Sequence, residues 1–407
     1  MKYDDIIERP VYLDKAMRLL DKGMMLIITG QRRVGKSYLL LQIKNRLEAK
    51  SANANVIYID KEELGNRNIN NYISLYEEVK LRLDKDKKNY LLIDEVQDIE
   101  GFEHVLRSLH AENLCQIVAT GSNAKVLSSE LSTILGGRYF ELNVNSLSYG
   151  EFLLFHNLED CDKSLRLYLT YGGLPGLRKV GLSEEEEVGD YLENVYNAIV
   201  LKDVIAREKI RNVRFLEKLI AFVADNIGKK ISTRNISRYI ESEKSDVSPT
   251  TVSSYLKFLT NAYIIKDMDG YDIHGKKLLE QTATYYFQDM GLCNFLAGFK
   301  LGNHIEKIIE NAIWHHLTTC GYKVKLGTLR AGDIDFVATK KDRTMYIQAT
   351  YVLESESTVK REFGNLMSIK DNFPKFVVSM DPLAEDRSDY PGIKHIHLRE
   401  FLLNKFE

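Results

Sequence analysis

Several features are scarce in this chain of 407 residues, and each scarcity argues against a class of protein. Six prolines are too few for a long Pro-rich linker. The four cysteines form no CxxC pair, so the sequence indicates neither a zinc site nor a disulfide framework. No apolar run has the length of a membrane span, and the polar N-terminus lacks the apolar core of a signal peptide. We therefore expect a cytoplasmic protein without a membrane partner.

An excess of charge of one sign is also missing. The chain has 56 Lys and Arg against 58 Asp and Glu, which gives a formal net charge of -2. Any nucleic-acid-binding surface therefore has to be local. The hydrophobic fraction of 44% and the charged fraction of 28% are near the globular average, which argues against disorder and coiled coil. The length predicts two to four domains.

A glycine-rich loop follows the apolar run at 24–29 and precedes residues at helical spacing. It reads G-Q-R-R-V-G-K-S, the full G-x-x-x-x-G-K-S pattern of a phosphate-binding loop. In this pattern backbone N–H groups surround the phosphates, the lysine reaches the β and γ oxygens, and the serine ligates Mg²⁺. The predicted ATP-binding residues are Gly30, Gln31, Arg32, Arg33, Val34, Gly35, Lys36, Ser37 and Tyr38.

A second apolar strand, at 90–95, ends in two adjacent carboxylates, which is the Walker B arrangement. We expect Asp94 to hold Mg²⁺ together with Ser37. Glu95 is placed to orient or deprotonate the attacking water. The predicted catalytic set therefore contains Lys36, Asp94 and Glu95.

A third strand, at 115–120, is followed by Gly121, Ser122 and Asn123. Ser122 and Asn123 either touch the γ-phosphate or the lytic water, or cap the next helix. Further strands at 55–60 and 138–143 complete five strands, with helices at about 101–112 and 124–134 among the last three. This alternation predicts an α/β fold with a doubly wound parallel sheet.

These motifs resemble those of prokaryotic AAA-type P-loop ATPases that carry a C-terminal domain of unknown function. The phosphate loop and L-L-I-D-E-V-Q are specific to P-loop ATPases generally. T-G-S-N, L-G-G-R at 135–138 and Y-G-G-L-P at 171–175 are similar to this particular family. The resemblance makes Arg138 a candidate catalytic residue that reaches the γ-phosphate of a neighbouring subunit in a homo-oligomer. The alternative is an arginine that pairs with a local carboxylate.

The middle of the chain is predicted to be helical. An acidic run at 184–187 suits a helix start, and 188–210 is expected to form one long helix. From 211 onward the pattern is helix, helix, helix and β-hairpin, which predicts a winged helix-turn-helix whose hairpin turns near Asp269-Gly270. Its third helix is expected to begin after Ser248. The exposed face of that helix is expected to carry Thr250, Thr251, Ser253, Ser254 and Lys257. Residues 201–300 hold 16 Lys or Arg against 12 Asp or Glu, a local excess of positive charge. The predicted winged helix therefore has two alternative roles, DNA contact and packing against protein.

The C-terminal segment resembles a PD-(D/E)XK nuclease core, in which acids gather Mg²⁺ and a lysine steadies the water. Its acids are expected at Glu306, Glu310 and Asp335, with Asn311 on the same helix and Gln348 on the next strand. The lysine position holds Thr350, which has no charge. We expect a degenerate nuclease-like domain, with Lys323 and Lys360 as candidates for a migrated lysine.

The sequence thus predicts four domains. They are a P-loop AAA-type core (1–145), a helical lid (146–210), a winged helix (211–295) and a PD-(D/E)XK-like domain (296–407). The expected function is an Mg²⁺-dependent ATP-binding protein and ATPase that couples nucleotide state to DNA binding or assembly. The alternatives are an ATP-gated DNA endonuclease and a STAND-like assembly switch that acts without DNA.

Overall fold

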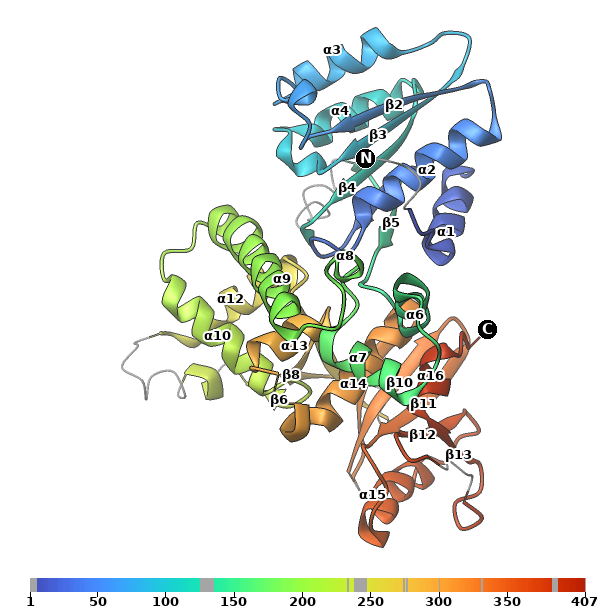
Figure 1. Ribbon diagram of the computed structural model, residues 1–407, viewed down its shortest axis with the longest axis vertical. Coiled ribbons are helices and arrows are strands. Elements are labelled where there is room, and N and C mark those ends of the chain that lie inside the picture. The colour runs from blue at the N-terminus through green and yellow to red at the C-terminus, as the bar shows by residue number, and fades with distance from the viewer. Residues whose placement is uncertain are drawn as a thin grey trace. The chain divides into compact units, whose positions relative to one another are not determined.

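The protein is described by a computed structural model, which divides into two compact units (Figure 1). The first unit contains the described residues up to Val144 together with Asn261–Tyr263, and the second contains the rest. The described residues are 6–124, 135–232, 234–237, 247–273, 275, 277–299, 301–330, 332–382 and 387–406. Among them, no helix combines the length and apolarity needed to span a bilayer.

Five parallel strands form the sheet of the first unit, in the order β2-β3-β4-β1-β5. Their bounds are β1 (Met25–Thr29), β2 (Ala54–Asp60), β3 (Lys88–Asp94), β4 (Gln116–Gly121) and β5 (Tyr139–Asn143). Each lies within two residues of a predicted run, so the expected parallel α/β sheet is confirmed. All five residues of β1 are buried, as expected of a central strand covered on both faces.

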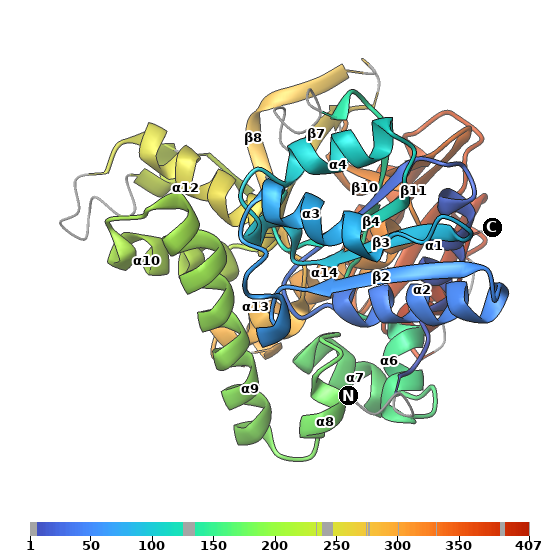
Figure 2. The same cartoon turned by 90° about the horizontal axis from the view of Figure 1, so that it is seen from above.

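Helices cover both faces of this sheet. They are α1 (Pro10–Leu20), α2 (Lys36–Lys50), α3 (Tyr72–Arg82) and α4 (Phe102–Ala111), with short 3-10 turns at Leu64–Asn66 (η2) and Val96–Asp98 (η3). Figure 2 shows α3 and α4 on one side of the sheet and α2 on the other. The helix predicted at 124–134 falls outside the described residues beyond its first position.

The second unit begins with helices. They are α6 (Tyr149–His156), α7 (Asp162–Tyr171), α8 (Leu177–Val180), α9 (Glu185–Ala198) and a π-helical continuation, η5 (Ile199–Ala206). Glu184 is the N-cap of α9 and three glutamates fill its first turn, as predicted for the acidic run. The expected long helix is therefore present, but it changes to π-helix at Ile199.

The segment after residue 211 contains α10 (Val213–Asp225), β6 (Lys230–Ile231), a helical turn at 234–237, α12 (Pro249–Asn261), β7 (Ile265–Asp272) and β8 (Lys277–Phe287). The Ser248 hydroxyl accepts from the Thr251 N–H at 3.2 Å, so the predicted cap of α12 is confirmed. The predicted turn at Asp269-Gly270 is wrong. Strand β7 runs through these residues with a shift in register between Met268 and Gly270, where a bulge takes up the extra residue.

One eight-stranded sheet, ordered β13-β12-β11-β10-β9-β7-β8-β6, joins this segment to the C-terminal part. Its remaining elements are α13 (Met290–Leu296), α14 (Leu301–Thr319), β9 (Lys323–Thr328), β10 (Asp333–Lys340), β11 (Arg343–Ala349), α15 (Glu356–Met367), β12 (Lys375–Ser379), β13 (Ile393–His397) and α16 (Leu398–Leu403). Strand β7 pairs with β9 in parallel, with Gly270 opposite Leu326. The domain boundary expected near residue 295 therefore crosses a continuous sheet, and the four-domain division stays a prediction.

Candidate functional site

The glycine-rich loop connects the buried strand β1 to the first turn of α2. Arg33 and Gly35 have φ angles of 72° and 96°, so the loop turns through two left-handed positions before the helix begins at Lys36. A Cβ on Gly30 would lie 2.2 Å from the Val144 carbonyl oxygen, and only glycine fits there. The first N–H groups of α2 have no acceptor within the helix, so this end of the helix can donate to an anion.

Lys36 lies inside this loop. Its side chain is buried, and its Nζ donates to the carbonyl oxygens of Gly30 at 3.1 Å and of Gln31 at 3.0 Å. The amide of Gln31 is also buried, and neither its nitrogen nor its oxygen has a hydrogen-bond partner in the described part of the chain. A buried polar group without a partner is costly, which suits a loop that receives a polar ligand. Of the other predicted loop residues, Arg33 is exposed, Arg32 and Tyr38 are half-buried, and Val34 is buried.

Asp94 ends β3 beside the loop. Its carboxylate accepts hydrogen bonds from the hydroxyls of Ser37 and Thr120. Burial raises the pKa of Asp94, and these two hydrogen bonds partly oppose that effect. Ser37 and Asp94, the two predicted Mg²⁺ ligands, are therefore brought together as adjacent hard oxygen donors, which is the chemistry that Mg²⁺ prefers. No group of three or more His, Cys, Asp or Glu able to hold a metal occurs among the described residues.

Glu95 follows in a left-handed conformation, with a φ of 52°. Its N–H donates to the Thr120 hydroxyl at 2.9 Å, and its carboxylate accepts from the side-chain amide of Gln97. Burial pushes the pKa of Glu95 up. The charge of Lys36, the hydrogen bond from Gln97 and the charge of Arg32 together outweigh burial and hold the pKa below its usual value. The carboxylate is therefore ionised at neutral pH, as a proton acceptor must be.

The residues after β4 border the same edge. Ser122 and Asn123 are fully buried. The Ser122 hydroxyl lies 3.5 Å from the Gln97 amide nitrogen and forms a hydrogen bond with Glu95. Ser122 is thus placed at the Walker B glutamate. The capping alternative concerns a helix outside the described residues.

Arg138 lies apart from these groups. It is exposed and precedes β5, whose first residue pairs with Met25 at the amino end of β1. The phosphate loop lies at the carboxyl end of β1, about 16 Å away at 3.3 Å per residue. The charge of Arg138 helps to lower the pKa of His110, after the effect of burial. Arg138 therefore cannot reach the loop of its own chain, and a role toward a second copy stays a prediction.

Three residues of this site were missed by sequence reasoning. Thr120 joins Asp94 and Glu95, as described above. Asp60 is paired in register with Asp94 across β2 and β3. Arg9 is buried and its Nη1 donates to the Val34 carbonyl oxygen at 3.0 Å. Strand register brings the first two to the site, and the T-G-S-N motif after a buried strand was the signal available for Thr120.

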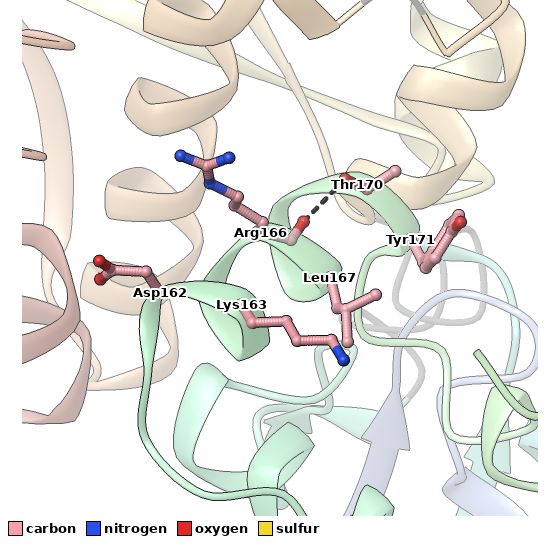
Figure 3. Close-up of a pocket in the computed structure, with 6 residues that line it drawn as sticks. All are labelled: Asp162, Lys163, Arg166, Leu167, Thr170 and Tyr171. Carbon is pink, nitrogen blue, oxygen red and sulfur yellow. Dashed lines mark hydrogen bonds between the residues drawn. The ribbon is translucent and has the colours of Figure 1, made fainter. Parts of the chain in front are cut away.

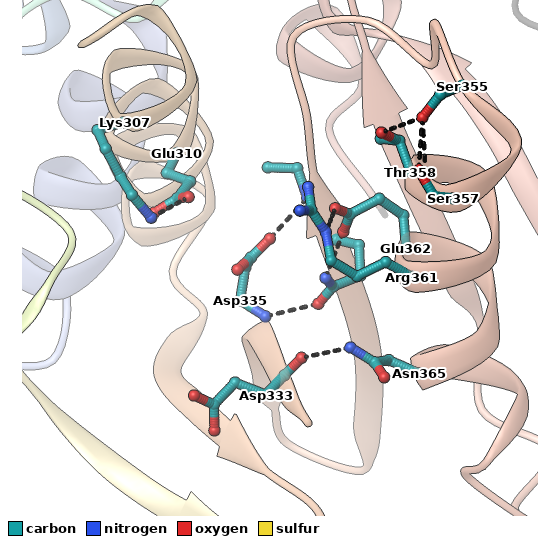
Figure 4. A network of polar contacts seen from close by, with 12 residues as sticks. Lys307, Glu310, Asp333, Asp335, Ser355, Ser357, Thr358, Arg361, Glu362 and Asn365 are labelled. Atoms are coloured by element: carbon teal, nitrogen blue, oxygen red, sulfur yellow. Dashed lines mark hydrogen bonds and ion pairs between the residues drawn. The ribbon is translucent and has the colours of Figure 1, made fainter. Parts of the chain in front are cut away.

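A second polar network lies in the C-terminal part (Figure 4). The Gln348 Oε1 accepts from the Asp335 N–H at 2.8 Å, and its Nε2 donates to Glu362 Oε2 at 2.6 Å. Asp335 Oδ2 accepts from the Ala349 N–H at 2.8 Å. Burial raises the pKa of Asp335 well above its usual value, and the nearby charge of Glu310 adds to this. Asp335 therefore lies within strand β10 and belongs to this network.

One of the cations beside these acids is Lys307. Its Nζ donates to Glu310 Oε1 at 2.6 Å, and the Tyr286 hydroxyl donates to Glu310 Oε2 at 3.1 Å. Burial lowers the pKa of Lys307, but the negative charges of Glu310 and Asp335 raise it above its usual value. The two predicted candidates, Lys323 and Lys360, are both exposed, as is Glu306.

The remaining predicted residues of this network are buried. Thr350 has a buried hydroxyl without a hydrogen-bond partner among the described residues. Asn311 bonds both backbone groups of Phe287, at 2.8 and 3.0 Å, which gives it a structural role between α14 and β8.

A pocket of about 330 Å³ lies along α7 (Figure 3). Its lining residues are Asp162, Lys163, Arg166, Leu167, Thr170 and Tyr171. They come from one helix of the second unit and include none of the predicted site residues.

Comparison with known proteins agrees with this geometry. Residues 22–153 match the family described as "AAA domain", and residues 162–302 match a "Domain of unknown function (DUF8612)". The Walker-type ATPase PABY2304 of Pyrococcus abyssi shares the fold with a TM-score of 0.51 and 17% identity, over 72% of this chain and 97% of that chain.

The parallel sheet, the phosphate loop and these matches define a P-loop ATPase fold of the AAA type. The chain belongs to the family of an uncharacterized protein of Haemophilus influenzae, with which it is 32% identical over 404 residues, covering 98% of this chain and 99% of that protein. It is also similar to the uncharacterized protein MJ1544 of Methanocaldococcus jannaschii, at 26% identity over 83% of this chain and 76% of that protein.

Proposed function

We propose that this protein binds ATP with Mg²⁺ at the phosphate loop and hydrolyses it. The observation that carries the proposal is the meeting of Lys36, Ser37, Asp94 and Glu95 at the carboxyl edge of one parallel sheet. In such sheets ligands bind outside the carboxyl ends of the strands.

Each residue has a distinct part in the proposed reaction. The loop N–H groups and the Lys36 ammonium bind the phosphates, whose charge replaces the loop carbonyls as the partner of Nζ. Ser37 and Asp94 would hold Mg²⁺, which when bound neutralises charge that develops on the phosphates. Glu95 accepts a proton from the attacking water on a carboxylate oxygen. Thr120 orients the Asp94 carboxylate and holds the backbone N–H of Glu95.

The test is a pair of variants at this edge. Glu95→Gln should bind ATP as tightly as the unchanged protein but lose about 10²–10⁴-fold in turnover, because the amide cannot accept the proton. Lys36→Ala should lose ATP binding, because the cation that contacts the phosphates is gone. Calorimetry measures binding, and phosphate release measures turnover. Equal turnover in Glu95→Gln would reduce Glu95 to a structural role.

The proposal extends to the output of the cycle. Nucleotide state would control DNA binding through a winged helix formed by 211–295, or assembly into a homo-oligomer in which Arg138 approaches the neighbouring γ-phosphate. The exposed positions Thr250, Ser253 and Lys257 on α12 support a backbone-contacting surface. Thr251 and Ser254 are half-buried, so this face is narrower than predicted. A STAND-like switch without DNA is the alternative.

For the C-terminal part we propose a degenerate PD-(D/E)XK-like domain without DNA cleavage, against the alternative of an ATP-gated endonuclease. Lys307, Tyr286, Gln348 and Arg361 already bond oxygens of Glu310 and Glu362. These hydrogen bonds use the carboxylate oxygens that a metal ion would need as ligands. The network therefore favours a structural role for these acids over metal binding.

A further inference from the structure

Gln97 lies near the Walker B glutamate and ends the L-L-I-D-E-V-Q motif, and the sequence pattern assigns it no role. It sits in η3, the 3-10 turn that directly follows Glu95. Its Nε2 donates to Glu95 Oε2, and the same nitrogen lies 3.5 Å from the Ser122 hydroxyl. A carboxylate only accepts hydrogen bonds, so the nitrogen of the amide has to face Glu95. This contact fixes which way the rest of the amide points.

The other atom of the amide, Oε1, is buried and has no hydrogen-bond partner in the described part of the chain. A buried carbonyl oxygen of this kind is normally bonded to a donor. The hydrogen bonds of Gln97 with Glu95 and Ser122 are both made by Nε2. The acceptor is therefore available to a donor that arrives with the substrate.

Glu95 itself has little freedom. Its backbone is held in the left-handed region at a φ of 52°, and its N–H is bonded to the Thr120 hydroxyl at 2.9 Å. A residue held in this sparsely populated region is kept there by its surroundings. The carboxylate and the Gln97 amide therefore form a preorganised pair beside the phosphate loop.

We propose that Gln97 positions the attacking water together with Glu95. Water donates one O–H to the Glu95 carboxylate and the other to Gln97 Oε1, which leaves an oxygen lone pair directed at the γ-phosphorus. The water oxygen forms the new bond to phosphorus as the bond to the β–γ bridging oxygen breaks. The proton passes to Glu95, and the products are ADP and phosphate. This inference rests on the proposed ATP hydrolysis and adds a positioning residue to it.

The first test is Gln97→Met, which keeps the length of the side chain and removes both polar atoms. The ATP dissociation constant should stay unchanged while kcat falls about 10²–10³-fold, the usual cost of one lost preorganised contact. The KM for ATP should also stay unchanged, so that the loss falls on kcat alone. A role in folding alone would lower the amount of active protein and leave the kcat of the folded fraction unchanged.

The second test is Gln97→Glu, which keeps an acceptor for water and replaces the donor by a negative charge. Its kcat should exceed that of Gln97→Met, because water can again donate a hydrogen bond to an oxygen of the side chain at position 97. The control is Gln116→Met, the same chemical change at the amino end of β4, where the Gln116 amide bonds Met24. It should keep the kcat and the KM of the unchanged protein.

The outcomes separate the two proposals. If the unchanged protein hydrolyses ATP and Gln97→Met matches its kcat, the role of Gln97 is overturned while the proposed ATPase activity stands. Weaker ATP binding in Gln97→Met would also overturn it, because the residue would then act on binding. No turnover by the unchanged protein would overturn the proposed function and this inference together.

Discussion

At the scale of single residues, the buried acids of the C-terminal part are balanced by cations that lie close to them in sequence. Lys307 is three residues from Glu310, and its charge also interacts with that of Asp335 on β10. Arg361 bonds Glu362 at 2.7 Å in the same network. A carboxylate enclosed in this way is tolerated only when a cation or donor faces it.

Lys307→Met should therefore destabilise the protein in a pH-dependent way. Near pH 8 the lost pairing of Glu310 should cost about 1–3 kcal/mol. Burial raises the folded-state pKa of Glu310 and Asp335 above the unfolded values, so the folded protein binds more protons between those values. Stability then rises as pH falls, and the loss caused by the variant should shrink near pH 5.

Denaturant unfolding at the two pH values measures this effect. Lys323→Met is the matched control, because Lys323 is exposed and should change stability by less than about 0.5 kcal/mol. The same loss for Lys307→Met at both pH values would show that the pairing with the carboxylates is not its cause.

At the scale of elements, the Y-G-G-L-P motif has a structural explanation. A Cβ on Gly173 would lie 2.4 Å from the Leu147 carbonyl oxygen, and the Gly173 N–H donates to Asp289 Oδ2 at 2.9 Å. A Cβ on Gly172 would meet Asp289 at 2.4 Å. The loop after α7 is thus packed against the start of α6 and the cap of α13, with no room for a side chain.

Gly173→Ala should consequently destabilise the second unit by about 1–3 kcal/mol, because overpacking forces the backbone of Leu147 to move. Gly189→Ala is the matched control. Gly189 lies within α9, and nothing lies within 4 Å of the position that its Cβ would take. That change should stabilise the helix by about 1 kcal/mol. Circular dichroism during unfolding distinguishes them, and equal midpoints for both variants would contradict this account.

The elements of the first unit were predictable because their signals are local. The apolar runs, the glycine loop and the acids after β3 are contiguous in sequence, and the strands appear within two residues of the expected ranges. Thr120 and Gln97 lie in recognised local motifs. Their contacts with the two acids, and the position of Asp60, depend on strand register and on a short turn that no local pattern encodes. The turn placed at Asp269-Gly270 failed because a Gly in a strand also marks a bulge.

At the scale of the whole molecule, strands of the predicted winged helix (211–295) and of the predicted C-terminal domain (296–407) belong to one sheet. Strand β7 pairs with β8 on one side and β9 on the other, and Lys230 forms an ion pair with Asp333 at 2.8 Å across this region. Periodicity reveals strands but not which strands pair at long range. Any DNA contact by α12 would therefore be made by a surface whose hairpin is anchored in the C-terminal sheet.

DNA binding by α12 is the last prediction, and it follows from the charge of the exposed Lys257. If this face grips the DNA backbone, affinity should fall steeply with salt, because phosphate contacts release counterions. Lys257→Glu should weaken binding alike for all duplex sequences and lower the salt slope by about 1. Lys85→Glu, an equal change of charge on an exposed loop of the first unit, should leave binding unchanged. Fluorescence titration of labelled duplexes measures both, and no binding of any duplex at low salt would assign α12 to protein packing.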